Sequence, residues 1–289
     1  MRAVTTDIQK PRLRNVFHKW FWDTWDNLGK VILGNIIWFI FSLPTLIVLF
    51  GFLFPKEGPS LLGALSLLLM IPPLFLSAPM TAALFHLTYF FVQEREASYR
   101  ELFIGFKKYF KKSVIIGFIL TLITILLLID IQFYGNYLPM KFIGQLLSAL
   151  GIWGFLFVYL MQVYLFPVLV QVGGSVRQIF KKSALLVLDN AVYTLVVGGV
   201  GALVVVGLAI IPRGIVFALT LWTVMTMSLI SILFNNAVAE ILKKYKKKEV
   251  EKEGEPGKPT SWKEIRKEEE VEERPRRRGW RDIFRPWDM

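Results

Sequence analysis

The chain has no cysteine and only two histidines among its 289 residues. The absence of cysteine excludes disulfides, thiolate catalysis and cysteine-ligated metals. His18 and His86 lie in different segments and no HExxH spacing is present, so we expect no metal site. The sequence also has no Gly-x-Ser-x-Gly elbow and no pair of Asp residues in the context of an intramembrane aspartyl protease. We therefore expect no enzymatic activity, no catalytic residue and no cofactor.

Long polar stretches are scarce before residue 243, and 54% of all residues are hydrophobic. Soluble domains have roughly 45–50% apolar residues, so this composition predicts a polytopic membrane protein. A helix needs about 20 apolar residues to cross the hydrocarbon core, and this length identifies about six candidate spans. They run approximately over residues 28–54, 61–92, 114–134, 142–172, 184–211 and 215–239. The expected fold is an all-α transmembrane helix bundle with additional interfacial amphipathic helices.

Basic residues are unevenly distributed between the connections of these spans. Of the 18 Lys and Arg residues before position 243, 15 flank one side and three flank the other. Basic loops remain on the cytoplasmic side of a membrane, so both termini are expected to be cytoplasmic. The first 27 residues are basic and aromatic and have neither the apolar core nor the cleavage site of a signal peptide. The first span is therefore expected to remain in the mature protein.

Composition divides the chain into three regions. Residues 1–27 form an amphipathic, aromatic cytoplasmic segment, residues 28–242 the transmembrane domain, and residues 243–289 a charged cytoplasmic tail. The tail has 16 of the 34 basic and 12 of the 22 acidic residues, so we predict that it is mostly disordered. Its candidate contacts for anionic lipid headgroups or a protein partner are Lys243, Lys244, Lys246, Lys247, Lys248, Arg276, Arg277, Arg278, Trp280, Phe284 and Trp287. Many other bases adjoin apolar segments, so the net charge of +12 does not predict nucleic-acid binding.

Three local patterns refine the spans. Aromatic and apolar residues from Phe17 to Leu28 follow helical spacing, which predicts a short helix in the headgroup layer. Pro72, Pro73 and Pro79 interrupt the second segment and indicate either one kinked span or a broken helix. The sequence Phe-Lys-Lys-Ser occurs at residues 110–113 and again at 180–183, each time before an outward span. This indicates either an internal duplication or the general preference for bases at cytoplasmic helix starts.

Several polar residues are expected at a similar depth in the transmembrane domain, roughly 10 Å from the cytoplasmic helix ends. They are Asn35, His86, Asp189, Asn190, Asn235 and Asn236. Ionisable groups in a bilayer are costly and often functional, so one hypothesis is a polar cavity in which Asp189 and His86 bind a cation, a proton or a polar ligand. The alternative starts from residues 191–211, which are apolar throughout. Residues 175–188 would then form an interfacial helix, with Asp189 and Asn190 at the membrane surface.

A series of motifs resembles the YesL-like family of bacterial integral membrane proteins over about residues 25–242. The motifs are Asn35-Ile36-Ile37-Trp38 leading to Ser42-Leu43-Pro44, Pro79 to Leu84, Phe103 to Ser113, and Phe180 to Asn190. In typical members the first proline motif passes almost directly into the Thr-Ala-Ala-Leu-like motif, whereas residues 45–78 intervene here. The resemblance implies a bacterial cytoplasmic-membrane protein without an established activity. It also implies an accessory role, because members are often encoded near carbohydrate uptake and degradation systems.

These observations favour a non-enzymatic accessory or assembly partner, with subunits of a carbohydrate transporter as candidate partners. A small secondary transporter or flippase with a polar cavity near the cytoplasmic side is the main alternative. A membrane anchor that recruits a soluble partner through its tail is the second alternative.

Overall fold

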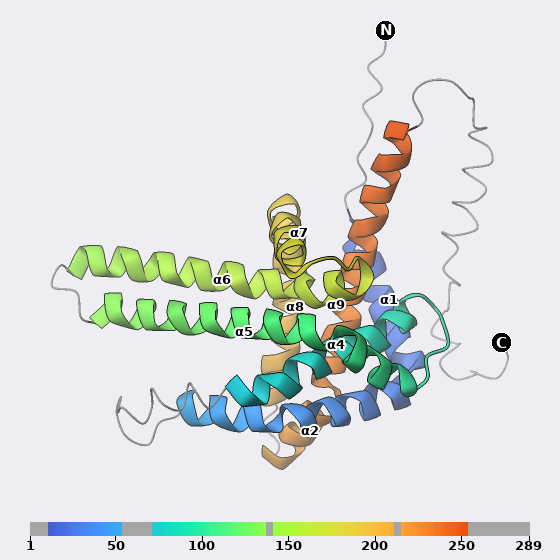
Figure 1. Cartoon of the computed structure of the whole chain (residues 1–289), viewed down its shortest axis with the longest axis horizontal. Helices are drawn as coiled ribbons and strands as arrows, with labels where there is room; N and C mark the ends of the chain where they lie inside the picture. The colour runs from blue at the N-terminus through green and yellow to red at the C-terminus, as the bar shows by residue number, and fades with distance from the viewer. Residues whose placement is uncertain (1–10, 54–70, 137–140, 211–214, 254–289) are drawn as a thin grey trace, which may run out of the picture. The chain divides into compact units, whose positions relative to one another are not determined.

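The computed structural model describes residues 11–53, 71–136, 141–210 and 215–253, and every regular element in these ranges is a helix (Figure 1). The predicted all-α class is therefore confirmed. The helices are α1 (Leu13–Asp26), α2 (Leu28–Leu53), α4 (Ile71–Val92), α5 (Arg100–Asn136), α6 (Lys141–Gln171), α7 (Val176–Asp189), α8 (Ala191–Ile210) and α9 (Ile215–Glu253). The chain divides into a unit of residues 1–244 and a unit of residues 245–289. All side-chain contacts given below lie within the first unit.

Three of these helices are long and apolar enough to cross a membrane, or up to five if each bent pair of helices is one span. The three are 100–135 in α5, 142–171 in α6 and 223–245 in α9, and a shorter apolar helix covers 76–92 in α4. The count of six spans and the cytoplasmic position of both termini remain predictions. Pro79 lies inside the uninterrupted α4, whereas residues 61–70 of the predicted second span lie outside the described residues.

Two sharp bends separate short amphipathic helices from the apolar helices that follow them. The axes of α1 and α2 differ by 87°, and those of α7 and α8 differ by 105°. Asn27 and Asn190 lie at these bends, and their backbone conformations are outside the helical region. The segment predicted over residues 184–211 is therefore not one continuous helix, because its first six residues belong to α7 and the residues after Asn190 belong to α8. The alternative interpretation, a separate helix before Asp189, agrees with the helix bounds.

The sharp connection between α6 and α7 explains where α7 begins. Gly173 and Gly174 have φ angles of 70° and 114°, which glycine adopts without the strain of a side chain. Ser175 then caps α7, because its hydroxyl accepts a hydrogen bond from the Gln178 backbone while the Gln178 side chain accepts one from the Ser175 backbone. This capping box satisfies two backbone donors that the first helical turn leaves free.

One cluster of the hydrophobic core lies where α4 meets α2, α5 and α9. Its buried members are Val31, Met80, Ala83, Leu84, Leu87, Phe91, Ala97, Leu102 and Ile232. Close approach of α4 and α5 requires a residue without a side chain, because a Cβ atom on Gly105 would lie 2.8 Å from the His86 Cβ and 3.1 Å from the Ala83 Cα. The core therefore brings together helices that are far apart in the sequence.

The outer parts of α5 and α6 pair with each other along small residues. The Ser148 hydroxyl donates to the Ile131 carbonyl at 3.1 Å. A Cβ atom on Gly151 would lie 2.7 Å from Ile131, and one on Gly154 would lie 3.3 Å from Leu127. Small residues allow helix backbones to approach closely in a membrane, so this pair forms a hairpin whose remaining faces point away from the molecule.

Candidate functional site

Most of the predicted polar residues lie on α9 or contact it. The α9 residues bond to α1, α2, α4, α6 and α8, so α9 joins the other helices at the predicted cytoplasmic side. Two of these bonds connect α1 and α8 to α9. Trp20 on α1 donates through Nε1 to the Leu229 carbonyl at 2.9 Å, and Tyr193 on α8 donates to the Ala237 carbonyl at 3.2 Å. The candidate site is therefore the set of polar contacts around α9.

Asn35 connects α2 to α9 and is fully buried. Its Nδ2 donates to the Thr223 carbonyl at 2.6 Å, and its Oδ1 accepts from the Ser228 backbone at 2.8 Å. The Ser228 hydroxyl in turn donates to the Val31 carbonyl at 2.9 Å. Asn35 thus holds two helices together through both ends of its amide.

Asn235 connects α9 to both α4 and α6. Its Nδ2 donates to the Phe85 carbonyl and to the Thr88 hydroxyl, each at 2.9 Å. Its Oδ1 accepts from Gln171 Nε2 at 3.0 Å. Because the amide is fully buried, these bonds satisfy a group that would otherwise be costly to remove from water.

Asn236, the next residue on α9, points towards α1 instead. Its Nδ2 donates to the Asp23 Oδ2 at 2.8 Å. Both side chains are buried, with 4% and 8% relative exposure for Asn236 and Asp23. Burial raises the pKa of Asp23 to about 7, an effect that the Asn236 hydrogen bond only partly opposes. The structure thus places a buried, titratable carboxyl beside one of the predicted residues.

His86 lies apart from these amides, between α4 and the start of α5. Its Nε2 lies 3.5 Å from the Glu101 Oε2, and its ring packs edge-on against Phe90 and Tyr109. The buried Nδ1 has no hydrogen-bond partner among the described residues. The imidazole therefore contacts α5, whereas the Asn235 amide contacts α4 from the α9 side.

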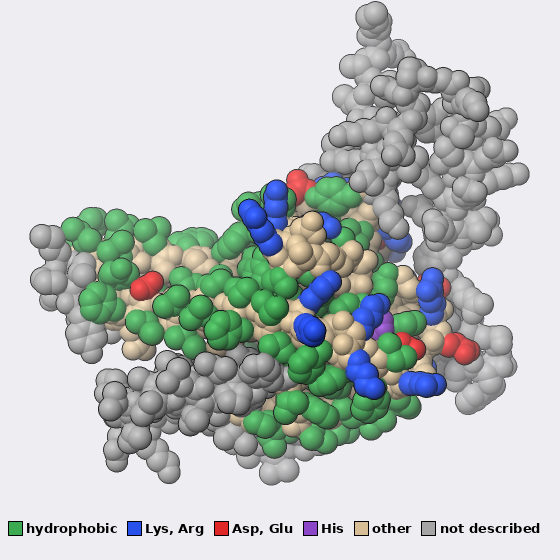
Figure 2. Space-filling model, viewed as in Figure 1, with side chains coloured by type: hydrophobic (Ala, Val, Ile, Leu, Met, Phe, Trp, Pro, Cys, Tyr) green, Lys and Arg blue, Asp and Glu red, His purple; other side chains and the backbone are tan. Residues whose placement is uncertain are grey.

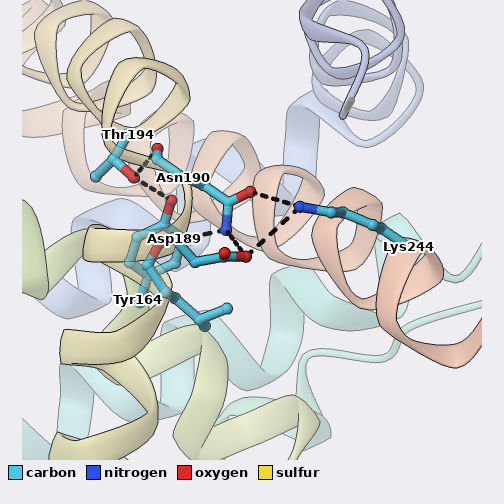
Figure 3. A network of polar contacts seen from close by, with 6 residues as sticks. Tyr164, Asp189, Asn190, Thr194 and Lys244 are labelled. Atoms are coloured by element: carbon cyan, nitrogen blue, oxygen red, sulfur yellow. Dashed lines mark hydrogen bonds and ion pairs between the residues drawn. The ribbon is translucent and has the colours of Figure 1, made fainter. Parts of the chain in front are cut away.

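Asp189 and Asn190 come together with Lys244 at the bend between α7 and α8 (Figure 3). The Lys244 Nζ lies 3.5 Å from the Asp189 Oδ2 and 3.4 Å from the Asn190 Oδ1. The Thr194 hydroxyl donates to the Asn190 carbonyl at 2.8 Å and also shares a hydrogen bond with the Tyr164 hydroxyl. Asp189 is about half exposed and Tyr164 is fully buried, so a continuous series of polar groups leads inwards from the surface.

Of the predicted lipid or partner contacts in the tail, Lys243 and Lys244 are described. Lys243 is exposed, whereas Lys244 is used in the contact with Asp189. The side chains of Lys246, Lys247 and Lys248, and all of Arg276, Arg277, Arg278, Trp280, Phe284 and Trp287, lie outside the described residues. The prediction that the tail is mostly disordered also falls outside the described residues beyond residue 253. Residues 243–253, which were assigned to the tail, belong to α9, whose apolar span was predicted to end at residue 239.

Sequence reasoning missed Asp23, Trp20 and Gln171 as partners in this site. Val16, Trp20 and Asp23 follow spacings of four and three, which places them on one helix face. That spacing was the available signal, because it places a carboxylate on the same helix face as a valine and a tryptophan. The aromatic residues Phe21 and Trp25 are instead 40% and 47% exposed, as expected for side chains that face lipid.

Residues 31–131 match a protein family described only as "Protein of unknown function, DUF624". The match covers most of α2, all of α4 and most of α5, and it includes Asn35, His86 and Gly105. No curated protein and no solved structure matches the chain. The chain is thus similar, over well under half of its length, to an uncharacterised family.

Proposed function

We propose that this chain is a YesL-like integral protein of the bacterial cytoplasmic membrane that acts, without catalysis, as an accessory or assembly partner of another membrane protein. The partner to test first is a subunit of a carbohydrate transporter, as the family resemblance implies. The polar residues around α9 then have a structural role, since most of them bond one helix to another. Anionic lipid headgroups are the second proposed contact, through the basic residues beside the spans.

The observation that carries this proposal is the outward surface of the α5–α6 hairpin. Of the residues in the apolar spans of α5 and α6, only 17% and 28% are buried within the chain, compared with 67% in the span of α9. Figure 2 shows hydrophobic side chains covering the outer parts of α5 and α6. On α5 the exposed residues recur at helical spacing, and they are Ile115, Phe118, Leu122, Leu126, Ile129 and Phe133. Such a stripe offers a continuous face to the helix of a partner.

The α6 side of the hairpin offers larger exposed side chains. Phe142 is 78% exposed and Trp153 is 69% exposed, and Leu146 and Leu150 lie between them on neighbouring turns. Exposed aromatic anchors contribute much of the binding energy in protein interfaces. Lipid can also cover these residues, so the proposal is decided by whether they contact another protein.

Replacement of three residues on this surface is expected to release the partner. Leu146→Ala, Leu150→Ala and Trp153→Ala together remove three of the large exposed apolar side chains of α6, and alanine is a good helix former. Affinity purification of the full chain in mild detergent should recover an integral-membrane transporter subunit with the unchanged protein, and at least about tenfold less with the triple variant.

The matched control is the triple variant Val192→Ala, Leu195→Ala and Leu203→Ala on α8, where three apolar side chains are 77%, 50% and 68% exposed. This variant should retain the partner. Recovery of no transporter subunit, or equal loss in both triple variants, would contradict the proposed role of the hairpin.

A small transporter or flippase is the second candidate function, favoured by the polar series from Asp189 to Tyr164. For this function, proteoliposomes with the purified protein should show solute flux that Asp189→Asn abolishes. If the chain is an accessory protein, the same vesicles should show no flux. Deletion of residues 243–289 addresses the anchor alternative, since an anchor would lose every partner with its tail.

A further inference from the structure

The Phe-Lys-Lys-Ser repeat belongs to a longer pattern that occurs three times. The aligned segments are residues 14–27 (RNVFHKWFWDTWDN), 107–120 (KKYFKKSVIIGFIL) and 177–190 (RQIFKKSALLVLDN). Each begins with a base, has Phe at its fourth position and has Lys at its sixth. The second lies within α5, and the first and third lie in α1 and α7 except for their last residues, Asn27 and Asn190. The first segment is harder to recognise from sequence, because His18 and Trp20 replace the second basic residue and the serine.

The three segments also bury the same positions. The third position is 2%, 6% and 0% exposed in Val16, Tyr109 and Ile179. The seventh position is buried in the two serine copies and partly buried in Trp20. Agreement in burial along three separate helices indicates that each segment packs against the rest of the protein through the same face. A position at which one segment has a different type of residue from the other two therefore marks a site that packing alone does not explain.

The tenth position shows such a departure. Ile116 and Leu186 occupy it in the second and third segments, with 0% and 9% exposure. The first segment has Asp23 there, with 8% exposure. Packing at this position is thus satisfied by a branched aliphatic residue and does not require a carboxyl group. A carboxyl group buried there loses its hydration, which is costly.

Among the described residues, the surroundings of Asp23 provide one direct hydrogen bond to its side chain and limited positive charge. Asn236 on α9 donates to its Oδ2 at 2.8 Å. Lys19, one turn earlier on α1, bonds to the Val92 carbonyl at 2.7 Å and pairs with Glu94 at 3.4 Å. The other charged groups that act on Asp23 are the acidic Glu94, in the turn after α4, and Asp26 on α1. Lys19 is thus shared with the end of α4, and two carboxylates oppose a negative charge on Asp23.

The position of Glu94 supports this arrangement. It has a φ angle of 55°, in the left-handed region where glycine is favoured. At the corresponding end of α6 this conformation is adopted by Gly173. Glu94 therefore keeps a side chain at a strained position, and that side chain contacts Lys19 of α1.

From this geometry we propose that Asp23 and Asn236 form a proton-binding site that controls the docking of α1 against α9. The neutral carboxyl is stable in the buried site and α1 stays docked. Release of the proton to water leaves a carboxylate with one amide donor, so docking weakens and α1 moves towards solvent, where the charge is hydrated. This site is independent of the partner surface proposed for α5 and α6.

The titration range follows from the direction of the pKa change. Burial raises the pKa of Asp23 from its ordinary value of 3.8 to about 7. The docked state therefore holds the proton more tightly than the undocked state. The free energy that the bound proton contributes to docking is complete below the ordinary pKa of Asp23. It declines as pH rises from that value and is lost by about pH 7.

The absence of cysteine allows a direct test in the full chain. A single cysteine at Val16, which is 2% exposed, reports undocking of α1 through its rate of maleimide labelling. A single cysteine at the exposed Arg14 on the same helix corrects for the pH dependence of thiol chemistry. In lipid nanodiscs, the ratio of the Val16→Cys rate to the Arg14→Cys rate should rise about tenfold or more between pH 5 and pH 8.

Two substitutions of Asp23 and one matched control decide the cause. Asp23→Asn and Asp23→Leu, the latter taken from the third segment, should each give a low ratio that no longer changes with pH. Asp26→Asn removes an exposed carboxylate that only weakly opposes the charge on Asp23, so the rise should persist and move to a slightly lower pH. The proposal is overturned if the ratio of the unsubstituted protein is constant with pH, or if Asp26→Asn removes the rise as effectively as Asp23→Asn.

Discussion

Gly105→Ala is expected to lower the free energy of unfolding by about 1–3 kcal/mol. The new Cβ atom would lie 2.8 Å from the His86 Cβ and 3.1 Å from the Ala83 Cα. Neither of these neighbouring atoms is the end of a flexible side chain, so α4 and α5 must move apart and the core between them loosens. Thermal unfolding of the purified protein in detergent measures the effect.

Gly199→Ala on α8 is the matched control for this prediction. A Cβ atom at Gly199 would meet nothing within 4 Å, and alanine is the better helix former by up to about 1 kcal/mol. The control should thus be neutral or slightly stabilising. Equal melting temperatures for the two variants would show that α4 and α5 do not pack as closely as described.

Asn235→Leu is expected to cost about 1–3 kcal/mol of stability. Leucine has a similar volume, so the substitution mainly removes hydrogen bonds to Phe85, Thr88 and Gln171. Gln171 keeps its bond to the Asn235 carbonyl, which limits the loss. Unfolding of the full chain by titration with a denaturing detergent measures the change.

Gln145→Leu on α6 provides the comparison, because Gln145 is exposed and the same change in side chain removes no helix–helix contact described here. It should leave stability within about 0.5 kcal/mol of the original value. A similar loss in both variants would argue against a structural role for the Asn235 amide.

The positions of the apolar helices were predictable from hydrophobicity, whereas their interruptions were less so. The first apolar segment was expected to begin at residue 28, and α2 begins at Leu28. The break at Asn190 was missed in the single-segment prediction because the residues before it are apolar enough to resemble a span. An amphipathic helix and the start of a span differ in which side chains face the protein, and average hydrophobicity does not record that direction.

The partners of the polar residues were not predictable from depth along the helices. Asn235 and Asn236 are adjacent and at equal depth, yet one bonds to α4 and α6 and the other to α1. Helical rotation of about 100° per residue separates their directions. The choice of partner depends on which helix occupies each direction, and this is a property of the tertiary packing.

The most direct test of the central proposal is photocrosslinking from the hairpin surface in native membranes. A photoreactive amino acid at Trp153 should give a discrete adduct with an integral-membrane transporter subunit. The same probe at Val163, which is 1% exposed on the same helix, should give no adduct with another protein. A protein that acts as an assembly partner through α5 and α6 predicts this difference. Adducts with lipid alone from Trp153, together with a discrete protein adduct from Val192 on α8, would contradict it.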